Sequence, residues 1–292
     1  MDKSYHDVKY NCDQISVWIV NDTRIGKLDF AQKKALSVMF AFRNVMVRNI
    51  QEGCKMKVIA LLTGRGNNTL QDKNVLDILG HPVLYYPARA AKKARNIDDW
   101  YCSSDDEKIL SAAEQEGYKR IVRPAELASP TSQHIECIVH ALGLMEQENN
   151  LPDICVVILA NNVTIKSEWI DQCIDIMMED PMITAVVPVY EDNDHHPLRA
   201  KSLNADGTLS MYEKGISGKV STNRQDLPKC FFLSHNFWVL RTDFVLSGEE
   251  GQQPWGFMGN VIRPYIVDKA IDIHYEEDLF LAQKWIIANY TD

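Results

Sequence analysis

Short apolar segments that favour β-strands alternate along this chain with segments that favour helices. This alternation is typical of a mainly parallel sheet, because parallel neighbours need long crossover connections that are usually helices. One predicted helix repeats Ile135, Ile138, Val139, Leu142 and Met145 at helical spacing. The predicted strands are residues 57–62, 99–103, 120–122, 154–159, 185–189 and 231–240. The predicted helices are residues 84–93, 106–116, 132–147, 167–178 and 276–288.

The first of these strands is followed by a polar loop rich in small residues. In α/β folds the carboxyl end of a strand is a common place for phosphate groups, because backbone N–H groups converge there. Gly64 and Gly66 let a ligand approach the backbone, and Arg65 and Lys73 supply positive charge. The spacing matches neither G-x-x-x-x-G-K-[ST] nor G-x-G-x-x-G. The residues alone leave two interpretations open, a nucleotide phosphate loop and an ordinary strand-to-helix turn.

The charge balance of the chain argues against one class of partner. Its 31 basic and 40 acidic residues give a formal net charge of -9. A general nucleic-acid binder owes its affinity to the neutralisation of many phosphates by basic residues. We therefore expect no nucleic-acid partner, and we expect any anionic substrate to be met by locally concentrated cations.

The sequence also indicates the compartment. No apolar run approaches the roughly 20 residues needed to span a bilayer, and the amino terminus lacks a basic-then-apolar signal pattern. The seven cysteines are scattered singly, without C-x-x-C spacing, which is typical of reduced thiols. We expect a cytoplasmic protein without a membrane partner.

Two segments stand apart from the alternating pattern. Residues 1–56 precede the main domain, residues 57–292, and are either an oligomerisation or partner-binding appendage or an extension without a role. Residues 192–226 are rich in Gly, Asn, Asp, Ser and Lys and predict a loop-rich insertion. Such insertions supply acceptor-binding side chains or a dimer arm.

A series of motifs follows the first strand in a consistent order. The motifs are G-R-G-N-N at 64–68 with K-N at 73–74, L-G-H-P at 79–82, S-S-D-D-E-K-I at 103–109, R-P-A-E-L-A-S-P-T at 123–131, R-Q-D-L-P at 224–228 and D-I-H-Y-E-E-D at 272–278. This series resembles one enzyme family, the CMP-N-acylneuraminate (CMP-sialic acid) synthetases, over about residues 57–288.

The resemblance implies a Rossmann-like α/β nucleotidyltransferase fold, with a mainly parallel sheet and helices on both faces, in a homodimer. It implies transfer of CMP from CTP to an acidic sugar such as a nonulosonic acid, with release of pyrophosphate and with Mg²⁺ as cofactor. By position, Arg65 and Lys73 would hold the triphosphate and Asp272 would bind Mg²⁺. The other implied nucleotide contacts are Gly66, Asn67, Asn74, Ser104 and Arg123.

The resemblance also implies contacts on the acceptor side. Arg199 follows an H-P motif that lies near the acceptor in the family, and Arg224 and Gln225 belong to the R-Q-D-L-P segment. Ser234 and His235 replace an Asn-Gly pair in the wall that faces the sugar.

The chain departs from the family pattern at three kinds of position. A loop lysine is missing, since Asn68 or Thr69 stands in its place. His274 replaces the second aspartate of the metal motif, although hard cations such as Mg²⁺ prefer oxygen ligands. The glutamine, serine and arginine of a further family motif are absent from residues 159–166. The acceptor is therefore predicted to differ from ordinary sialic acid. The alternatives are nucleotidyl transfer to another acidic acceptor, such as a phosphonate, and a catalytically weakened nucleotide-binding protein.

Three polar clusters favour structural interpretations. The neighbouring His195 and His196 suggest an exposed loop ahead of a metal site. His134, on a predicted helix, favours packing or solvent exposure over catalysis. Asp105 and Asp106 precede a helix, where an acid favours the helix dipole, so we predict a helix cap.

Overall fold

The structure is a computed structural model that describes residues 55–66, 68–215 and 218–290. Residues 56–292 form one compact unit. The predicted extension, residues 1–56, lies outside the described residues except for its last two positions. Asn67, a predicted nucleotide contact, also lies outside them.

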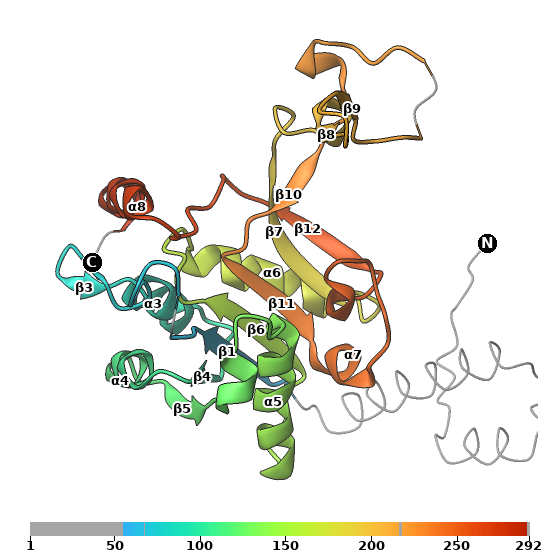
Figure 1. The fold of residues 1–292 in the computed structure, drawn as a ribbon. Helices are drawn as coiled ribbons and strands as arrows, with labels where there is room; N and C mark the ends of the chain where they lie inside the picture. The colour runs from blue at the N-terminus through green and yellow to red at the C-terminus, as the bar shows by residue number, and fades with distance from the viewer. Residues whose placement is uncertain (1–54, 67, 216–217, 291–292) are drawn as a thin grey trace, which may run out of the picture. The chain divides into compact units, whose positions relative to one another are not determined.

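A mixed, mostly parallel sheet forms the centre of this unit (Figure 1). Strand β1 pairs in parallel with β4 on one side and with β6 on the other. Two strands, β10 and β11, run antiparallel to their neighbours. Across the sheet the order is β5 (Lys119–Val122), β4 (Asp99–Ser104), β1 (Val58–Thr63), β6 (Ile154–Leu159), β11 (Phe237–Arg241) and β7 (Ala185–Glu191), with β10 (Phe231–Leu233) and β12 (Ile262–Ile266) also paired to β7.

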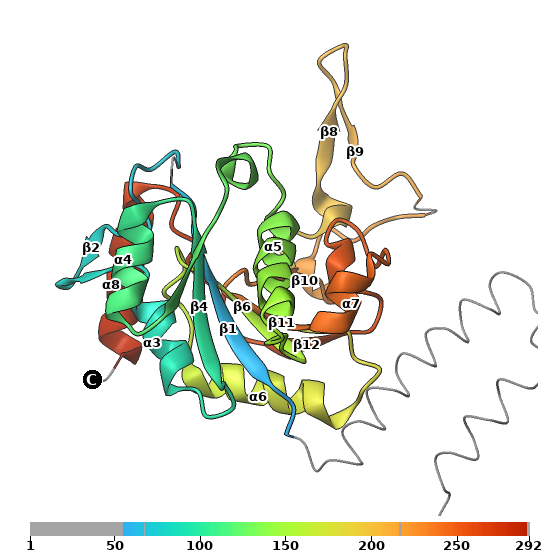
Figure 2. The ribbon, with the colours of Figure 1, turned by 90° about the horizontal axis from the view of Figure 1, so that it is seen from below.

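Helices cover both faces of the sheet (Figure 2). The face with α5 (His134–Gln147) and α7 (Thr242–Ser247) is opposite the face with α3 (Tyr85–Lys93), α4 (Glu107–Gln115) and α6 (Ser167–Glu179). All six residues of β1 are buried, because a strand covered on both faces presents apolar side chains in both directions. The predicted Rossmann-like α/β class is confirmed.

Helix α5 illustrates how the sequence pattern produces this packing. Ile138, Leu142 and Met145 are buried and belong to the core on this face of the sheet. Val139 is 39% exposed, although it shares the apolar repeat. One helix turn spans 3.6 residues, so a neighbour of Ile138 is rotated away from the sheet.

A smaller apolar cluster joins the carboxyl-terminal helix α8 (Glu276–Asn289) to the segment around β2 (Asp77–Ile78) and β3 (His81–Pro82). Ala282 and Ile286 of α8 are buried there with Ile273. Asp272 and His274 lie in the segment just before α8. The cluster fixes this segment beside the loop that follows β1.

The predicted strand 231–240 is wrong in one respect, because it is two strands. Residues 234–236 interrupt it, and His235 adopts a left-handed conformation with φ of 52°. The break moves the chain across the sheet: β10 pairs only with β7, whereas β11 also pairs with β6. The side-chain amide of the buried Asn236 donates to the carbonyl oxygen of Thr164, which anchors the break.

The segment predicted as an insertion forms an arm that extends away from the central sheet (Figure 1). It contains a two-stranded ribbon of β8 (Lys201–Leu203) and β9 (Leu209–Met211), with short 3-10 helices η3 (Pro197–Arg199) and η4 (Arg224–Asp226). Two further 3-10 helices are η2 (Ala125–Ala128) and η5 (Gly256–Met258). Among the described residues, no helix is both long and apolar enough to cross a bilayer.

Candidate active site

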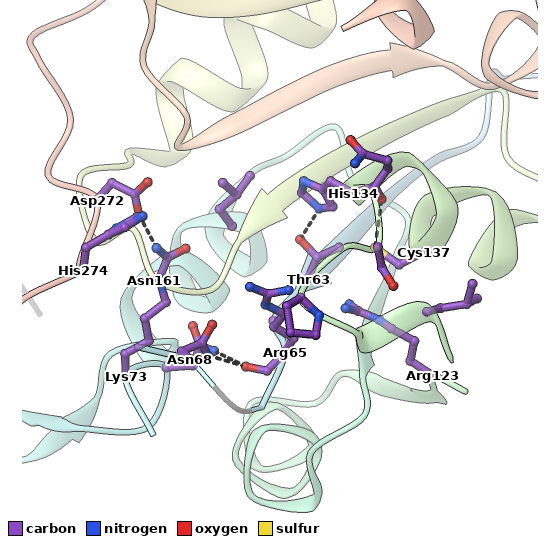
Figure 3. A pocket seen from close by; sticks show the side chains of 17 residues that line it. Thr63, Arg65, Asn68, Lys73, Arg123, His134, Cys137, Asn161, Asp272 and His274 are labelled. Atoms are coloured by element: carbon purple, nitrogen blue, oxygen red, sulfur yellow. Dashed lines mark hydrogen bonds and ion pairs between the residues drawn. The ribbon is translucent and has the colours of Figure 1, made fainter. Parts of the chain in front are cut away.

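A cavity of about 360 Å³ lies at the carboxyl ends of β1 and β6 (Figure 3). After β1 the chain adds β4 and β5 on one side of that strand, and it then crosses back to place β6 on the other side. Open α/β sheets bind ligands at such a switch point. Of the predicted site residues, Arg65, Lys73, Asn74, Arg123, Asp272 and His274 line the cavity. They come from three separate parts of the sequence, so the fold brings the predicted nucleotide and metal residues together.

The loop after β1 is held by hydrogen bonds to its own backbone. The side-chain amides of Asn68 and Asn74 both donate to the carbonyl oxygen of Arg65, at 2.6 and 3.1 Å. The backbone N–H of Gly66 donates to Asp105 Oδ1 at 3.1 Å. A Cβ atom at Gly66 would lie 2.9 Å from Asp106 Oδ2, so only glycine fits here without a shift of that carboxylate.

The two cations of the loop are each tethered to a carbonyl oxygen at the cavity wall. Arg65 Nη1 donates to Ser129 O at 2.9 Å, and Lys73 Nζ donates to Ile273 O at 2.9 Å. Burial lowers the pKa of Lys73, nearby Arg65 lowers it further, and Asp272 opposes the shift. A polyanionic ligand would relieve the repulsion between these cations, so the pair is suited to bind phosphates.

Asp272 faces the loop from the segment before α8. Its Oδ1 accepts a hydrogen bond from the side-chain amide of Asn161, which also donates to Ile273 O at 3.3 Å. His274 Nδ1 lies 3.4 Å from the same Oδ1. Burial raises the pKa of Asp272, while Lys73 and His274 oppose the shift. Burial thus disfavours the charged form of both Lys73 and Asp272.

Arg123 forms another part of the wall and is almost fully buried. Its Nη2 donates to Ser103 O at 2.7 Å, and its Nε donates to Ser103 Oγ at 3.3 Å. Its backbone N–H donates to Ser104 O at 2.8 Å. Ser104 is fully buried next to Arg123 and does not itself line the cavity.

His134, the first residue of α5, lines the cavity, a role that we did not predict from the sequence. Thr63 Oγ1 lies 2.9 Å from His134 Nε2 and 3.2 Å from Ile158 O, so hydrogen bonding links the ring to the end of β1. Burial and the charge of Arg123 lower the pKa of His134 to about 4, so the imidazole is neutral at pH 7.

Thr63, Asn68 and Asn161 are further lining residues that we did not predict as ligand contacts. The sequence could have pointed to Thr63 and Asn161, because both lie just after the carboxyl end of a predicted strand, where α/β folds bind ligands. For His134 the only signal was its place at a helix start next to the R-P-A-E-L-A segment, and the sequence favoured packing.

Five predicted acceptor-side residues lie outside this cavity. Arg199 and Arg224 belong to the arm, where both pair with Asp194, at 3.1 and 2.6 Å, and Gln225 lies next to Arg224. Ser234 is buried, and its hydroxyl has no hydrogen-bond partner among the described residues.

His235 lines a second cavity of about 540 Å³, whose other lining residues are mostly apolar. The centroid of its ring lies 5.2 Å from the ring centroid of Trp255 and 6.0 Å from that of Trp238. Trp238 also contacts the His134 ring, at 5.0 Å. Trp238 therefore lies between a residue of the first cavity and a residue of the second.

The polar clusters have structural roles. His195 is exposed and lies 2.7 Å from Asp192, and His196 Nδ1 accepts from the Leu198 backbone. The carboxylate of Asp106 accepts from the first N–H groups of α4, which confirms the predicted cap. Within the described ranges, no group of three or more His, Cys, Asp or Glu side chains is arranged to hold a metal ion.

Comparisons with known proteins agree with this arrangement. A sequence profile described as "Cytidylyltransferase" matches residues 63–212, which are 150 of the 292 residues. The N-acylneuraminate cytidylyltransferase of Escherichia coli O18:K1:H7 is 32% identical over 91 residues, 31% of this chain and 22% of that protein. The pseudaminic acid cytidylyltransferase of Campylobacter jejuni serotype O:2 is 22% identical over 198 residues, 66% of this chain and 84% of that protein.

A solved structure supports the fold assignment. The structure of CMP:2-keto-3-deoxy-manno-octonic acid synthetase complexed with CTP matches with a TM-score of 0.59 at 15% identity. The match covers 80% of this chain and 99% of that chain. Together with the profile match over more than half of the sequence, these likenesses at low identity show that the chain belongs to the cytidylyltransferase family, as a divergent member.

Proposed function

We propose that this protein transfers CMP from CTP to an acidic sugar of the nonulosonic acid type and releases pyrophosphate. The observation that carries the proposal is the convergence of Arg65, Lys73 and Asp272 on one cavity at the carboxyl ends of β1 and β6. The names of two relatives, an N-acylneuraminate and a pseudaminic acid cytidylyltransferase, support the class of acceptor.

The roles of the residues follow from the charges that the reaction must move. A hydroxyl oxygen of the sugar forms a bond to the α-phosphorus of CTP and loses its proton to solvent, and the bond from that phosphorus to the pyrophosphate oxygen breaks. Negative charge then accumulates on the pyrophosphate. Arg65 and Lys73 stabilise that charge, since cations already held in place by hydrogen bonds cost little reorganisation. Arg123 and the neighbouring Ser104 lie on the side where we place the cytosine.

Mg²⁺ fits part of this donor set. Mg²⁺ is commonly bound by one or two carboxylates together with substrate phosphates, so the Asp272 carboxylate and the triphosphate oxygens suffice. When bound there, the ion would neutralise charge on the phosphate oxygens. His274 contributes nitrogen, which Mg²⁺ accepts poorly, and the family's second carboxylate is absent at this position.

On the acceptor side, we propose that a second copy of the chain supplies residues through the arm. Arg199, Arg224 and Gln225 lie on the arm rather than in the lining of the nucleotide cavity. The arm carries Leu203 and Leu209, cross-strand neighbours that are 76% and 67% exposed. An isolated two-stranded ribbon is only marginally stable in water, so we expect the apolar side chains of this ribbon to pack against another protein surface.

The oligomer is tested by sedimentation of the full chain. Leu203→Asp should shift the protein from dimer to monomer, because it places a charge in the proposed interface. Leu144→Asp, on the exposed side of α5, serves as the control and should leave the dimer intact. Equal sedimentation of all three proteins as monomers would remove the homodimer from the proposal.

We also place the enzyme in the cytoplasm. The five cysteines of the described residues are free thiols. Free thiols are usual where glutathione and thioredoxin keep cysteines reduced.

The activity is tested by pyrophosphate release from CTP, UTP, ATP and GTP with a panel of nonulosonic acids, octulosonic acids and phosphonates. We expect release with CTP and at least one acidic sugar. Arg65→Met should lower kcat/KM by on the order of ten- to a hundredfold, the cost of one ionic hydrogen bond. Arg89→Met, which loses a pair with Glu116 and a contact with the Tyr85 ring but does not line the cavity, is the control. CTP binding without turnover of any acceptor would favour the alternative, a nucleotide-binding protein that has lost catalysis.

A further inference from the structure

Asp272 and His274 form a donor pair at the edge of the nucleotide cavity, which both residues line. They are separated by one residue, and in an extended chain such residues point to the same side. The residue between them, Ile273, points the other way and is fully buried. His274 Nδ1 and Asp272 Oδ1 lie 3.4 Å apart.

This separation suits two ligands of one ion. Two donor atoms that each lie about 2.1 Å from a metal are about 3.0 Å apart at a right angle and about 3.4 Å apart at the tetrahedral angle. The pair therefore needs a closing movement of a few tenths of an ångström at most to share an ion.

Asn161 orients the carboxylate of this pair. Its amide nitrogen donates to Asp272 Oδ1 and to Ile273 O, and two acceptors on the same side fix the orientation of the amide. The side-chain oxygen is then directed away from them and adds no ligand here (Figure 3). The protein thus offers one carboxylate and one imidazole, and no further histidine, cysteine or carboxylate joins them within the described part of the chain.

The charge around the pair indicates when an ion would bind. Lys73 lies close enough to Asp272 to affect its pKa, so the single carboxylate is already partly neutralised. An ion would gain most of its remaining ligands and countercharge from a bound triphosphate. The inference therefore rests on the proposed function for the presence of CTP.

We propose that His274 makes this a mixed nitrogen and oxygen site that binds later first-row divalent cations, with Co²⁺ as the probe, in preference to Mg²⁺. Imidazole is a good ligand for these cations, and their affinity for a given nitrogen and oxygen site rises along the series from Mn²⁺ to Cu²⁺. Mg²⁺ gains little from nitrogen. Replacement of a carboxylate by His274 thus changes which ion the site prefers.

The test is paramagnetic proton NMR of the full chain with CTP and Co²⁺, without acceptor. Coordination through Nδ1 leaves a proton on Nε2, which should give a strongly shifted, exchangeable imidazole signal. His274→Asp should abolish that signal and restore an oxygen-only site. His195→Gln, which changes an exposed histidine of the arm, is the control and should retain the signal.

Titration calorimetry with CTP present gives the second readout. His274→Ala should weaken Co²⁺ binding by on the order of tenfold or more while it leaves Mg²⁺ binding nearly unchanged. His274→Asp should raise the affinity for Mg²⁺ relative to Co²⁺. Thermal denaturation of each variant checks that the fold is retained.

Two results would overturn the inference. One is a Co²⁺ complex of the wild-type protein without a histidine signal. The other is an unchanged ratio of Co²⁺ to Mg²⁺ affinity in His274→Asp, which would mean that His274 only pairs with Asp272. The proposed function fails in a different way, by the absence of pyrophosphate with every nucleotide, acceptor and cation.

Discussion

The ammonium group of Lys73 donates a hydrogen bond of 2.9 Å to the carbonyl oxygen of Ile273, 200 residues later in the sequence. The bond joins the loop after β1 to the segment that carries Asp272 and His274. The cation expected to hold the phosphates and the carboxylate expected to hold a metal are thus kept in one place by the same contact.

Lys73→Met should therefore affect binding more than stability. The change removes a charge from the cavity and also the contact with Ile273. We expect CTP affinity to fall by on the order of ten- to a hundredfold, the value of a charged hydrogen bond. Calorimetric titration with CTP measures this. Lys108→Met, which removes an exposed pair with Asp72 at 2.6 Å, should change affinity by less than about threefold. A similar loss in both variants would contradict a direct role for Lys73.

Gly66→Ala should disturb the loop and the start of α4 together. The new Cβ atom would lie 2.9 Å from Asp106 Oδ2, and Asp106 caps α4. Loss of such a cap costs about 1 kcal/mol. We expect a lower free energy of unfolding in urea and weaker CTP binding.

Gly143→Ala is the matched control for that change. Gly143 lies within α5, and a Cβ atom there would meet no atom within 4 Å. Alanine favours a helix by about 1 kcal/mol over glycine, so this variant should be more stable than the wild type. Equal destabilisation by both substitutions would show that the contact with Asp106 is not the cause.

Arg123→Lys should be costly although it preserves the charge. The buried guanidinium makes two hydrogen bonds to Ser103, and an ammonium group cannot reproduce that fork. We expect a loss of about 2 kcal/mol in the free energy of unfolding, because a buried charge would be left with incomplete partners. Arg120→Lys, at an exposed pair with Glu107 and Glu114, should lower the free energy of unfolding much less, because solvent screens such pairs.

The stability of the protein should depend on pH through His134. Its pKa is about 4 in the folded protein and near 6.5 in the unfolded chain, so the unfolded chain binds more protons between these values. Stability therefore falls as pH drops from about 6.5 toward 4, by at most about 3 kcal/mol. His134→Gln should flatten this part of the profile in urea titrations, and His195→Gln should not. Parallel profiles for His134→Gln and the wild type would exclude His134 as the cause.

The predicted elements agree with the structure where local pattern and burial act together. The ends of β6 are those predicted, because the apolar run from Ile154 to Leu159 coincides with the strand, whose first five residues are buried. The strand predicted at residues 231–240 is interrupted, because pairing with β6 and β7 in turn requires a break that hydrophobicity does not record. The short edge strand β12 was not predicted, since it is largely exposed and contains Pro264.

The sequence by itself determined the class of fold, the position of the polar loop after the first strand and the residues that resemble a nucleotide and metal site, because these depend on residue type and on spacing along the chain. Only the tertiary structure decided that Lys73, Asn161 and Asp272 meet at one cavity, that Arg199 and Arg224 lie outside it, and that His134 and Thr63 form its inner wall. These relations depend on which strand ends are neighbours and on how side chains share hydrogen bonds. Both arise from packing between segments that are far apart in the sequence.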